Sequence, residues 1–441
     1  MSLLHRLSKR GAFNFAHRDV WGPREKSMGN PWSPANPRGT VILRLAENSL
    51  LHEDIAEFIN AQTAVHPPHH LTYSTGPRGS RRLRRAAAAF LTDEFQSREA
   101  ITADNLFITP GCSSALDALA WAICDEGEGI LIPQPFYNGF NFDTQYRSNA
   151  RVVGVTYGDV EEYSGLDDLF CPDINKRALE AALHRAQNEG ITPPETIMEF
   201  ASFCGKNGLH FISDEIYAKS LFSNPAIPNA TPFVSTLALD LCDAIDPSLT
   251  HILYGASKDF CANGLRLGFV CTKNEGIIGA MSSISMFSWS PHILQDVWAV
   301  MLKDRQWVND FMLRKSKLMA ENYTIATSFL RERNIRYSES NAGLFIWLDL
   351  RHLLLPQSSL QSDYGVLRVA SPDASIYKQR EMQIADICAA NGVMIAPGHI
   401  YMPEECGWFR MTFTVGKEAL AEGLDRLARS LEQVEADIQN V

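Results

Sequence analysis

Short apolar runs alternate along the chain with segments whose apolar residues recur every three or four positions. The first pattern predicts buried strands and the second predicts helices. Strands are expected at residues 106–109, 129–132, 151–155, 209–213, 251–254 and 267–271. Helices are expected at residues 80–95, 115–124, 176–188 and 195–207. This alternation predicts a three-layer α/β fold, in which helices cover both faces of a mostly parallel sheet.

The pattern changes after residue 290. A long helix over 293–332 is expected first, followed by an apolar run at 342–348 and a polar insertion at 356–375. A further helix and a short strand at 409–413 come last. This order predicts a second, smaller α+β domain.

At 441 residues the chain is long enough for two closely integrated domains. Its first 45 residues are rich in Gly, Pro, Asn and Trp, which indicates an extended arm. We therefore expect an arm over 1–45, a large domain over 46–290 and a small domain over 291–441.

Charge and cysteine placement restrict the partners and the compartment. The formal net charge of -11 argues against nucleic acid or an anionic membrane as the main partner. Five of the eight residues from 78 to 85 are arginine, which indicates either an anion-binding patch or, as we favour, the solvated start of a helix. Nine scattered cysteines without a CxxC pair favour reduced thiols. With neither a membrane span nor a secretory signal in the sequence, we expect a cytoplasmic protein.

Lys258 follows a predicted strand in the segment Gly255-Ala256-Ser257-Lys258. A lysine amine that is partly desolvated and near other cations loses its proton more readily and becomes a nucleophile. Taken alone, a lysine in this position is usually a solvated surface charge. Arg266, however, stands between Gly264 and Gly268, where its planar fork can bind a phosphate while the glycines let the backbone approach. The two residues together indicate an amine beside an anion site.

Further polar residues occupy the ends of predicted strands. Gly111-Cys112-Ser113 joins a strand to a helix, so its amides can form a second anion site, although such a turn is often only a turn. Asp214 also ends a strand, where a carboxylate can pair with a protonated pyridine nitrogen. Tyr217 can reach a ring hydroxyl from the same turn, and Tyr137 offers a face for stacking. Arg410, on a late strand, is a candidate clamp for a substrate carboxylate.

In the order of these motifs the sequence resembles the fold-type I class I/II aminotransferases, and among them the 1-aminocyclopropane-1-carboxylate (ACC) synthase-like branch. The resemblance covers the chain from about Asn36 to Phe413. It is carried by Asn36-Pro37, Leu45-Ala46-Glu47-Asn48, Pro135-Phe136-Tyr137-Asn138-Gly139-Phe140, Ser213-Asp214-Glu215-Ile216-Tyr217, Ser257-Lys258-Asp259, Asn341-Ala342-Gly343-Leu344-Phe345, Pro397-Gly398 and Gly407-Trp408-Phe409-Arg410.

The resemblance implies pyridoxal 5'-phosphate as the cofactor. Lys258 is similar to the lysine that holds this cofactor covalently and shuttles the Cα proton of the substrate. Asp214 is similar to the partner of the pyridine nitrogen, Tyr217 to the partner of the ring oxygen and Tyr137 to the stacking aromatic residue.

The resemblance also implies how phosphate, substrate and a second subunit are bound. The residues similar to the phosphate cup are Cys112, Ser113, Ser257 and Arg266. Arg410 is similar to the anchor of the α-carboxylate of an amino-acid substrate. Tyr73 is similar to the tyrosine that reaches the phosphate across a dimer interface, so a homodimer with shared active sites is expected. No metal ion is expected.

One element of the family is missing from the sequence. Family members have a strand that ends in an Asn-Pro-x-Asn-Pro-x-Gly loop before the helix that leads to the Asp214 strand. Here the chain passes around Thr192 from one predicted helix straight into the next, whereas a strand and loop need roughly ten to twenty residues. Three explanations stay open: a mis-spliced product, an inactive paralogue, or a sheet that closes differently and leaves Tyr217 alone to hold the ring oxygen.

Glu47 bears on which reaction is catalysed. It is similar to the glutamate that ACC synthases direct toward S-adenosylmethionine, but a structural arm residue of an ordinary aminotransferase explains it equally well. Three functions therefore remain: an aminotransferase, a lyase acting on S-adenosylmethionine or another sulfur-bearing amino-acid derivative, and a cofactor-binding paralogue without activity.

Overall fold

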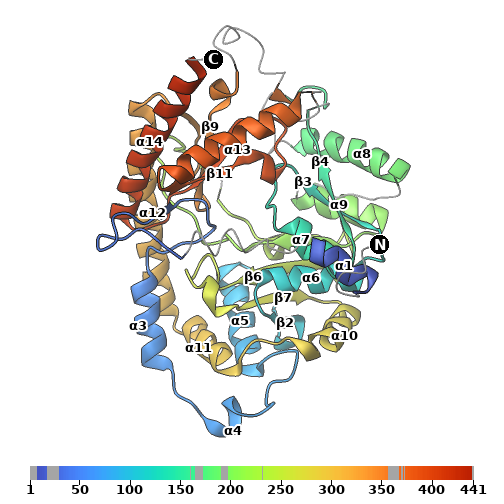
Figure 1. The fold of residues 1–441 in the computed structure, drawn as a ribbon. Coiled ribbons are helices and arrows are strands. Elements are labelled where there is room, and N and C mark those ends of the chain that lie inside the picture. The colour runs from blue at the N-terminus through green and yellow to red at the C-terminus, as the bar shows by residue number, and fades with distance from the viewer. Residues whose placement is uncertain are drawn as a thin grey trace.

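The computed structural model describes residues 7–16, 29–158, 160–163, 172–189, 197–230, 232–355, 367–368, 371 and 373–439. Helices cover both faces of the central strands, as the alternation along the sequence predicts (Figure 1). The expected α/β class is therefore confirmed. None of the described helices combines the length and the apolar character needed to cross a membrane.

The central sheet has the strand order β2-β7-β6-β5. These strands are β2 (Leu106–Thr109), β7 (Gly268–Thr272), β6 (Thr250–Gly255) and β5 (Phe211–Asp214). β7 runs antiparallel to both of its neighbours, whereas β5 and β6 are parallel. The register pairs Gly268 with both Thr109 and Gly255. The ends of β2 and β6 therefore lie beside the beginning of β7. The end of β5, which runs parallel to β6, lies at the same edge of the sheet.

Side chains of the central strands alternate between two apolar cores. In β7, Phe269 and Cys271 pack into one core and Val270 into the other. The first core also contains residues of α3 (His52–Gln62), α5 (Arg81–Glu94), α11 (His292–Lys303) and α12 (Arg305–Glu332). The second contains residues of α6 (Cys112–Ile123) and α10 (Glu275–Ile284). The strand period thus places a helical layer on each face.

A separate two-stranded parallel sheet contains β3 (Gly129–Pro133) and β4 (Arg151–Val155). Its core includes residues of α8 (Pro172–Glu189). Within the described ranges, no strand joins β3 to β5, so the two sheets are not hydrogen-bonded to each other. Thr192, near which the sequence lacks the family's strand, lies outside the described residues. The three explanations for the missing strand therefore stay predictions.

The C-terminal part contains an antiparallel sheet of order β11-β12-β9-β8. Its strands are β11 (Ala396–Pro397), β12 (Trp408–Thr412), β9 (Phe345–Asp349) and β8 (Arg336–Ser338). This sheet shares one apolar core with residues of α12, α13 (Ala374–Ala390) and α14 (Lys417–Gln439). The N-terminal chain joins this part through β1 (Val41–Ile42), which pairs in parallel with β10 (Val393–Met394).

Several helices differ from the sequence-based expectation. A single helix over 293–332 is wrong, because α11 ends at Lys303 and α12 begins at Arg305. Asp304 accepts a hydrogen bond of 3.0 Å from the backbone N–H of Trp307 and so caps the second helix. Within the expected extended arm, α1 (Lys9–Ala16) is helical. The final helix α14 was not predicted, although buried Leu420, Leu424, Leu427 and Leu431 recur at helical spacing.

The arginine-rich segment begins helix α5. Ser80 caps this helix by accepting a hydrogen bond from the backbone N–H of Leu83 at 3.1 Å. Arg82 pairs with Asp296 at 3.1 Å and Arg84 with Asp104 at 3.5 Å. These contacts favour a helix start over an anion-binding patch.

Candidate active site

Lys258 lies in the turn that follows β6, close to the edge where the central strands meet. Its Nζ donates a hydrogen bond of 2.5 Å to the carbonyl oxygen of Ala46, in the chain that leads away from β1. Burial and, after it, the nearby Arg410 guanidinium lower the pKa of this amine to about 8, against the opposing charges of Glu47 and Asp214. Lys258 is thus partly uncharged near neutral pH.

The turn from β2 into α6 provides an anion site. The helix begins at Cys112, and its first-turn amides have no acceptor inside the helix. Gly111, at a φ of 89°, precedes it, and a Cβ there would lie 2.7 Å from the terminal guanidinium nitrogen of Arg266. A Cβ on Gly268 would lie 2.9 Å from the carbonyl carbon of Gly111. Glycine at both positions lets Arg266 and the helix N-terminus approach each other closely.

Arg266 is fixed in the left-handed region at a φ of 52°. Its guanidinium donates to the carbonyl oxygens of Asn263 at 2.8 Å and Pro110 at 3.2 Å. The side chains of Arg266 and Ser113 are both exposed. The remaining donors of the fork are therefore accessible to an anion from solvent.

Asp214 ends β5 and accepts a hydrogen bond of 3.3 Å from the backbone N–H of Ile216. Its carboxylate has protein atoms on most sides, and this burial raises its pKa to about 6 against the opposing effects of that hydrogen bond and of Lys258. The side chain nevertheless keeps substantial contact with solvent. An amine or a pyridinium ion can therefore reach this carboxylate from solvent.

Two tyrosines lie near this carboxylate. Burial raises the pKa of Tyr217, and the charge of Asp214 adds to the rise while Arg410 opposes it. The phenol therefore stays protonated and can donate a hydrogen bond. Tyr137, whose side chain is 42% exposed, packs edge-on against Phe140 with 5.5 Å between ring centroids. It also belongs to the electrostatic surroundings of Tyr217.

Arg410 of β12 is held by the N-terminal chain and by aromatic rings. One terminal nitrogen donates to the carbonyl oxygen of Arg44 at 2.7 Å. The guanidinium carbon lies 4.0 Å from the ring centroid of Phe345 and 4.5 Å from that of Tyr401. These contacts fix the orientation of the Arg410 guanidinium plane. A guanidinium group is weakly hydrated and stacks on aromatic faces, so its desolvation costs little free energy.

Glu47 follows Ala46 and lies close enough to affect the Lys258 amine. Its Oε1 accepts a hydrogen bond of 2.7 Å from the side-chain amide of Asn263, the first residue of the short 3-10 helix that leads to Arg266. Its carbonyl oxygen accepts from the Thr414 hydroxyl at 2.8 Å. The chain around Glu47 thus connects the C-terminal sheet with the Lys258–Arg266 segment.

Tyr73 is the one predicted site residue placed apart from the others. Its side chain is 91% exposed and packs edge-on against Trp289, with 6.1 Å between ring centroids. Ser257, by contrast, is half-buried next to Lys258. The described single chain therefore brings together Lys258 and its predicted neighbours but not Tyr73.

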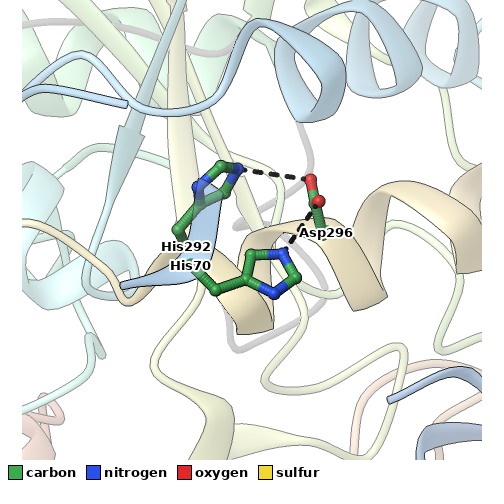
Figure 2. Close-up of side chains that lie close together, drawn as sticks. All are labelled: His70, His292 and Asp296. Carbon is green, nitrogen blue, oxygen red and sulfur yellow. Dashed lines mark hydrogen bonds and ion pairs between the residues drawn. The ribbon is translucent and has the colours of Figure 1, made fainter. Parts of the chain in front are cut away.

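A cluster of polar side chains fixes the segment that carries Tyr73. His70, at the end of α4 (Pro67–His70), points toward His292 and Asp296 of α11 (Figure 2). His70 Nε2 lies 3.2 Å from Asp296 Oδ2, and His292 Nε2 lies 3.6 Å from Asp296 Oδ1. The backbone N–H of His66 donates to His70 Nδ1 at 3.0 Å, so the neutral ring carries its proton on Nε2 and donates it to Asp296. A metal would need that nitrogen unprotonated, and the cluster therefore favours a structural clamp.

Sequence reasoning missed several residues that shape the site. The Ala46 carbonyl carries no sequence signal, because any residue supplies one. Asn263 lies beside Gly264 in the segment already singled out, so its polar side chain was a usable clue. Phe345 ends one of the family segments, and Tyr401 follows another, Pro397-Gly398, by three residues. Nothing in the spacing of the two residues along the sequence shows that both contact Arg410.

The strand-edge amine, the anion site and the accessible carboxylate form the arrangement that the resemblance to fold-type I pyridoxal-phosphate proteins implies. The family model for aminotransferase class I and II matches residues 40–427. The chain therefore belongs to this family of pyridoxal-phosphate-dependent proteins, in its ACC synthase-like branch.

Relatives and solved structures agree with this membership. The probable aminotransferase aclI of Aspergillus oryzae is 31% identical over 439 residues, which cover 96% of this chain and 97% of that protein. The ACC synthase-like protein 1 of Arabidopsis thaliana is 27% identical over 422 residues, covering 90% of this chain and 80% of the relative. The structure of a multiple substrate aminotransferase from Thermococcus profundus shares the fold with a TM-score of 0.70 and 15% identity, over 99% of this chain and 100% of that one.

The titration of Lys258 can be measured in the protein without cofactor. Trace labelling with acetic anhydride over a pH series, read by mass spectrometry, is expected to show a midpoint of about 8 for the Lys258 peptide, because only the uncharged amine reacts. In Arg410→Leu the midpoint should rise, since a cation that lowers the pKa is lost. Exposed Lys303 provides the reference for reagent reactivity. An unchanged midpoint in Arg410→Leu would contradict the assigned electrostatics.

Proposed function

We propose that the protein is a cytoplasmic pyridoxal-phosphate-dependent aminotransferase that acts on an α-amino acid. The observation that carries this proposal is the setting of Lys258, a half-buried amine that donates to the Ala46 carbonyl oxygen and has a pKa of about 8 near both Asp214 and Arg410. An amine of this kind is nucleophilic near neutral pH. The printed name of the Aspergillus relative also supports amino transfer, and the free cysteines of the described chain support a reducing compartment.

The residues of the site fit the cofactor chemically. A phosphate dianion suits the first-turn amides of α6 together with the accessible donors of Arg266. A protonated pyridine nitrogen suits the carboxylate of Asp214, which is accessible and lies near the Lys258 amine. When bound, pyridoxal phosphate supplies an electron sink for the electron pair released at the substrate Cα.

The chain's own side chains then bind the substrate and move protons. Lys258 accepts the proton at Cα and returns it, and a pKa of about 8 keeps both forms of the amine accessible near neutral pH. Arg410 binds the α-carboxylate once it exchanges its hydrogen bond to the Arg44 carbonyl for the substrate. Tyr217, kept protonated by burial, would donate a hydrogen bond to the ring oxygen of the bound cofactor.

We also propose a homodimer in which Tyr73 of each chain serves the site of the other. Its 91% exposure leaves the phenol accessible to a second subunit. Leu71 is 72% exposed in the same segment, and Phe287 is 91% exposed close in sequence to Trp289. Exposed apolar side chains of this size are typical of surfaces that a partner covers.

The cofactor proposal predicts a covalent adduct at Lys258. Adding pyridoxal phosphate to the protein should produce a visible absorbance band, which an α-amino acid then changes without any 2-oxo acid present. Lys258→Ala should lose the band, because the bond to the amine cannot form, whereas Lys303→Ala should keep it. Absence of the band in the unaltered protein would favour the paralogue without activity.

A second candidate reaction is elimination from S-adenosylmethionine, as in ACC synthases. Glu47 favours it, because the carboxylate lies near the Lys258 amine and is oriented by Asn263. A carboxylate in this position can attract the positive charge of a sulfonium ion. The name of the Arabidopsis relative supports the same candidate.

S-adenosylmethionine separates the two reactions. If the protein is a lyase, incubation without a 2-oxo acid should release methylthioadenosine, detected by chromatography. Glu47→Gln should then lower the turnover of S-adenosylmethionine about tenfold or more, since the charge is lost but the shape is kept. In the same variant, the absorbance change that follows addition of an amino acid with an uncharged side chain should occur at nearly the rate seen in the unaltered protein. Absence of methylthioadenosine would reject the lyase.

Mixed dimers test whether Tyr73 acts across the interface. Homodimers of Lys258→Ala and of Tyr73→Phe should each be impaired. A mixed dimer of one chain of each kind should recover about half the activity of the unaltered dimer, because one of its two sites then holds an intact Lys258 and an intact Tyr73. If Tyr73 serves its own chain, both sites of the mixed dimer are defective and no recovery follows.

A further inference from the structure

Asp259, the residue next to Lys258, forms an ion pair that is completely buried. The side chains of Asp259 and Lys315 are both 0% exposed. Lys315 Nζ donates to the backbone carbonyl oxygen of Asp259 at 2.7 Å and lies 3.4 Å from its carboxylate oxygen Oδ1. Two charges without water need each other and further hydrogen bonds, because either alone would be strongly unfavourable.

The Asp259 carboxylate also accepts hydrogen bonds from three other donors. The backbone N–H of Lys219 donates to Oδ2 at 2.8 Å, and the Tyr254 hydroxyl donates to the same oxygen at 2.9 Å. The Ser220 hydroxyl donates to Oδ1 at 2.7 Å. One carboxylate thereby connects the turn after β5, the strand β6 and the helix α12.

These connections reach residues on two sides of the candidate active site. Ser220 closes a turn by donating its backbone N–H to the carbonyl oxygen of Tyr217 at 2.9 Å. The charge of Asp259 also contributes to the raised pKa of Tyr217, after burial and the nearer charged groups. On the other side, Asp259 is covalently joined to Lys258. The carboxylate therefore fixes the Tyr217 turn relative to the Lys258 turn.

Apolar packing holds the same segment against α12. Phe260 is fully buried and stacks on Phe311 of α12, with 6.4 Å between ring centroids. It also packs edge-on against Trp298 of α11 at 6.3 Å. Position 315 follows Phe311 by one helical turn, so the two residues lie on the same face of α12. The helix thus contacts the Lys258 segment through an ion pair and a ring stack.

We propose that Asp259 and Lys315 are positioning residues for Lys258. Their ion pair couples α12, which also packs in the C-terminal core, to the place and protonation of the cofactor lysine. In relation to the cofactor the inference rests on the proposed function, whereas the expected effect of the ion pair on the Lys258 amine can be measured in the cofactor-free protein. The intact pair contributes no net charge next to the Lys258 amine. Removal of either partner leaves the charge of the other uncompensated.

Charge-changing substitutions distinguish positioning from a purely structural role. Lys315→Met leaves a buried negative charge and should raise the midpoint of Lys258 labelling, whereas Asp259→Asn leaves a positive charge and should lower it. Each shift should be about one pH unit, in opposite directions. The double variant should return the midpoint close to its original value. Acetic anhydride labelling of the cofactor-free protein measures the Lys258 midpoint in all three variants.

Met319→Ala is the matched control. Met319 is also 0% exposed on α12, one helical turn beyond Lys315, but it carries no charge. Its truncation should lower the melting temperature without moving the midpoint. If Lys315→Met does not fold, Asp259→Asn and the double variant, compared with Met319→Ala, decide the sign of the effect. Shifts that are absent, or that have the same sign in both single variants, overturn the proposal.

Cofactor affinity gives a second, separate measurement. In equilibrium dialysis, Lys315→Met should bind pyridoxal phosphate about tenfold more weakly than the unaltered protein, because the lysine turn is no longer held in place. Lys315→Arg keeps the charge and should restore part of the affinity. If the unaltered protein binds no cofactor, the proposed function fails, while the labelling midpoints still decide the role of the ion pair.

Discussion

Burial of the Lys258 amine at the end of β6 is the constraint on which the rest of the site depends. A lysine charge is costly to desolvate, so its surroundings must tolerate the uncharged form and offset the charged one. Arg410 favours the uncharged form, whereas Glu47 and Asp214 favour the charged form. Because these groups come from different sheets and from the N-terminal chain, a reactive amine here requires both parts of the molecule to be packed together.

The register of the central sheet brings the anion site to this amine. β7 runs antiparallel to β2 and β6, so Gly268 at its beginning lies beside the ends of both strands. A side chain at Gly268 or Gly111 would collide with neighbouring backbone or with Arg266. The two glycines therefore permit the approach of helix α6, Arg266 and the Lys258 turn, and a substitution at either would change the backbone itself.

Local pattern was sufficient to predict the central strands, because a buried strand appears in the sequence as a short apolar run with a polar residue at its end. Asp214 and Lys258 were singled out because they follow such runs, and Arg266 because two glycines flank it. The structure places all three near one edge of the sheet, although their roles remain predictions. The break at Asp304 and the partnership of Glu47 with Asn263 depend on side-chain geometry that periodicity does not contain. Tyr73 is a different case: its proposed partner belongs to a second chain, and neither one sequence nor one chain can bring the two together.

Within the described residues, the β3–β4 sheet is joined to the rest by side chains and loops instead of by strand pairing with β5. Arg147 of the chain before β4 binds Asp117 of α6, and the backbone N–H of Tyr157 donates to Glu404 Oε1 at 2.6 Å. The backbone N–H of Phe136 donates to the carbonyl oxygen of Tyr401 at 2.9 Å. Tyr137 is therefore positioned from the C-terminal side, whereas Asp214 is positioned by the central sheet. A ligand that contacts both would add a connection between the two sheets, so its binding should stabilise this junction more than either sheet alone.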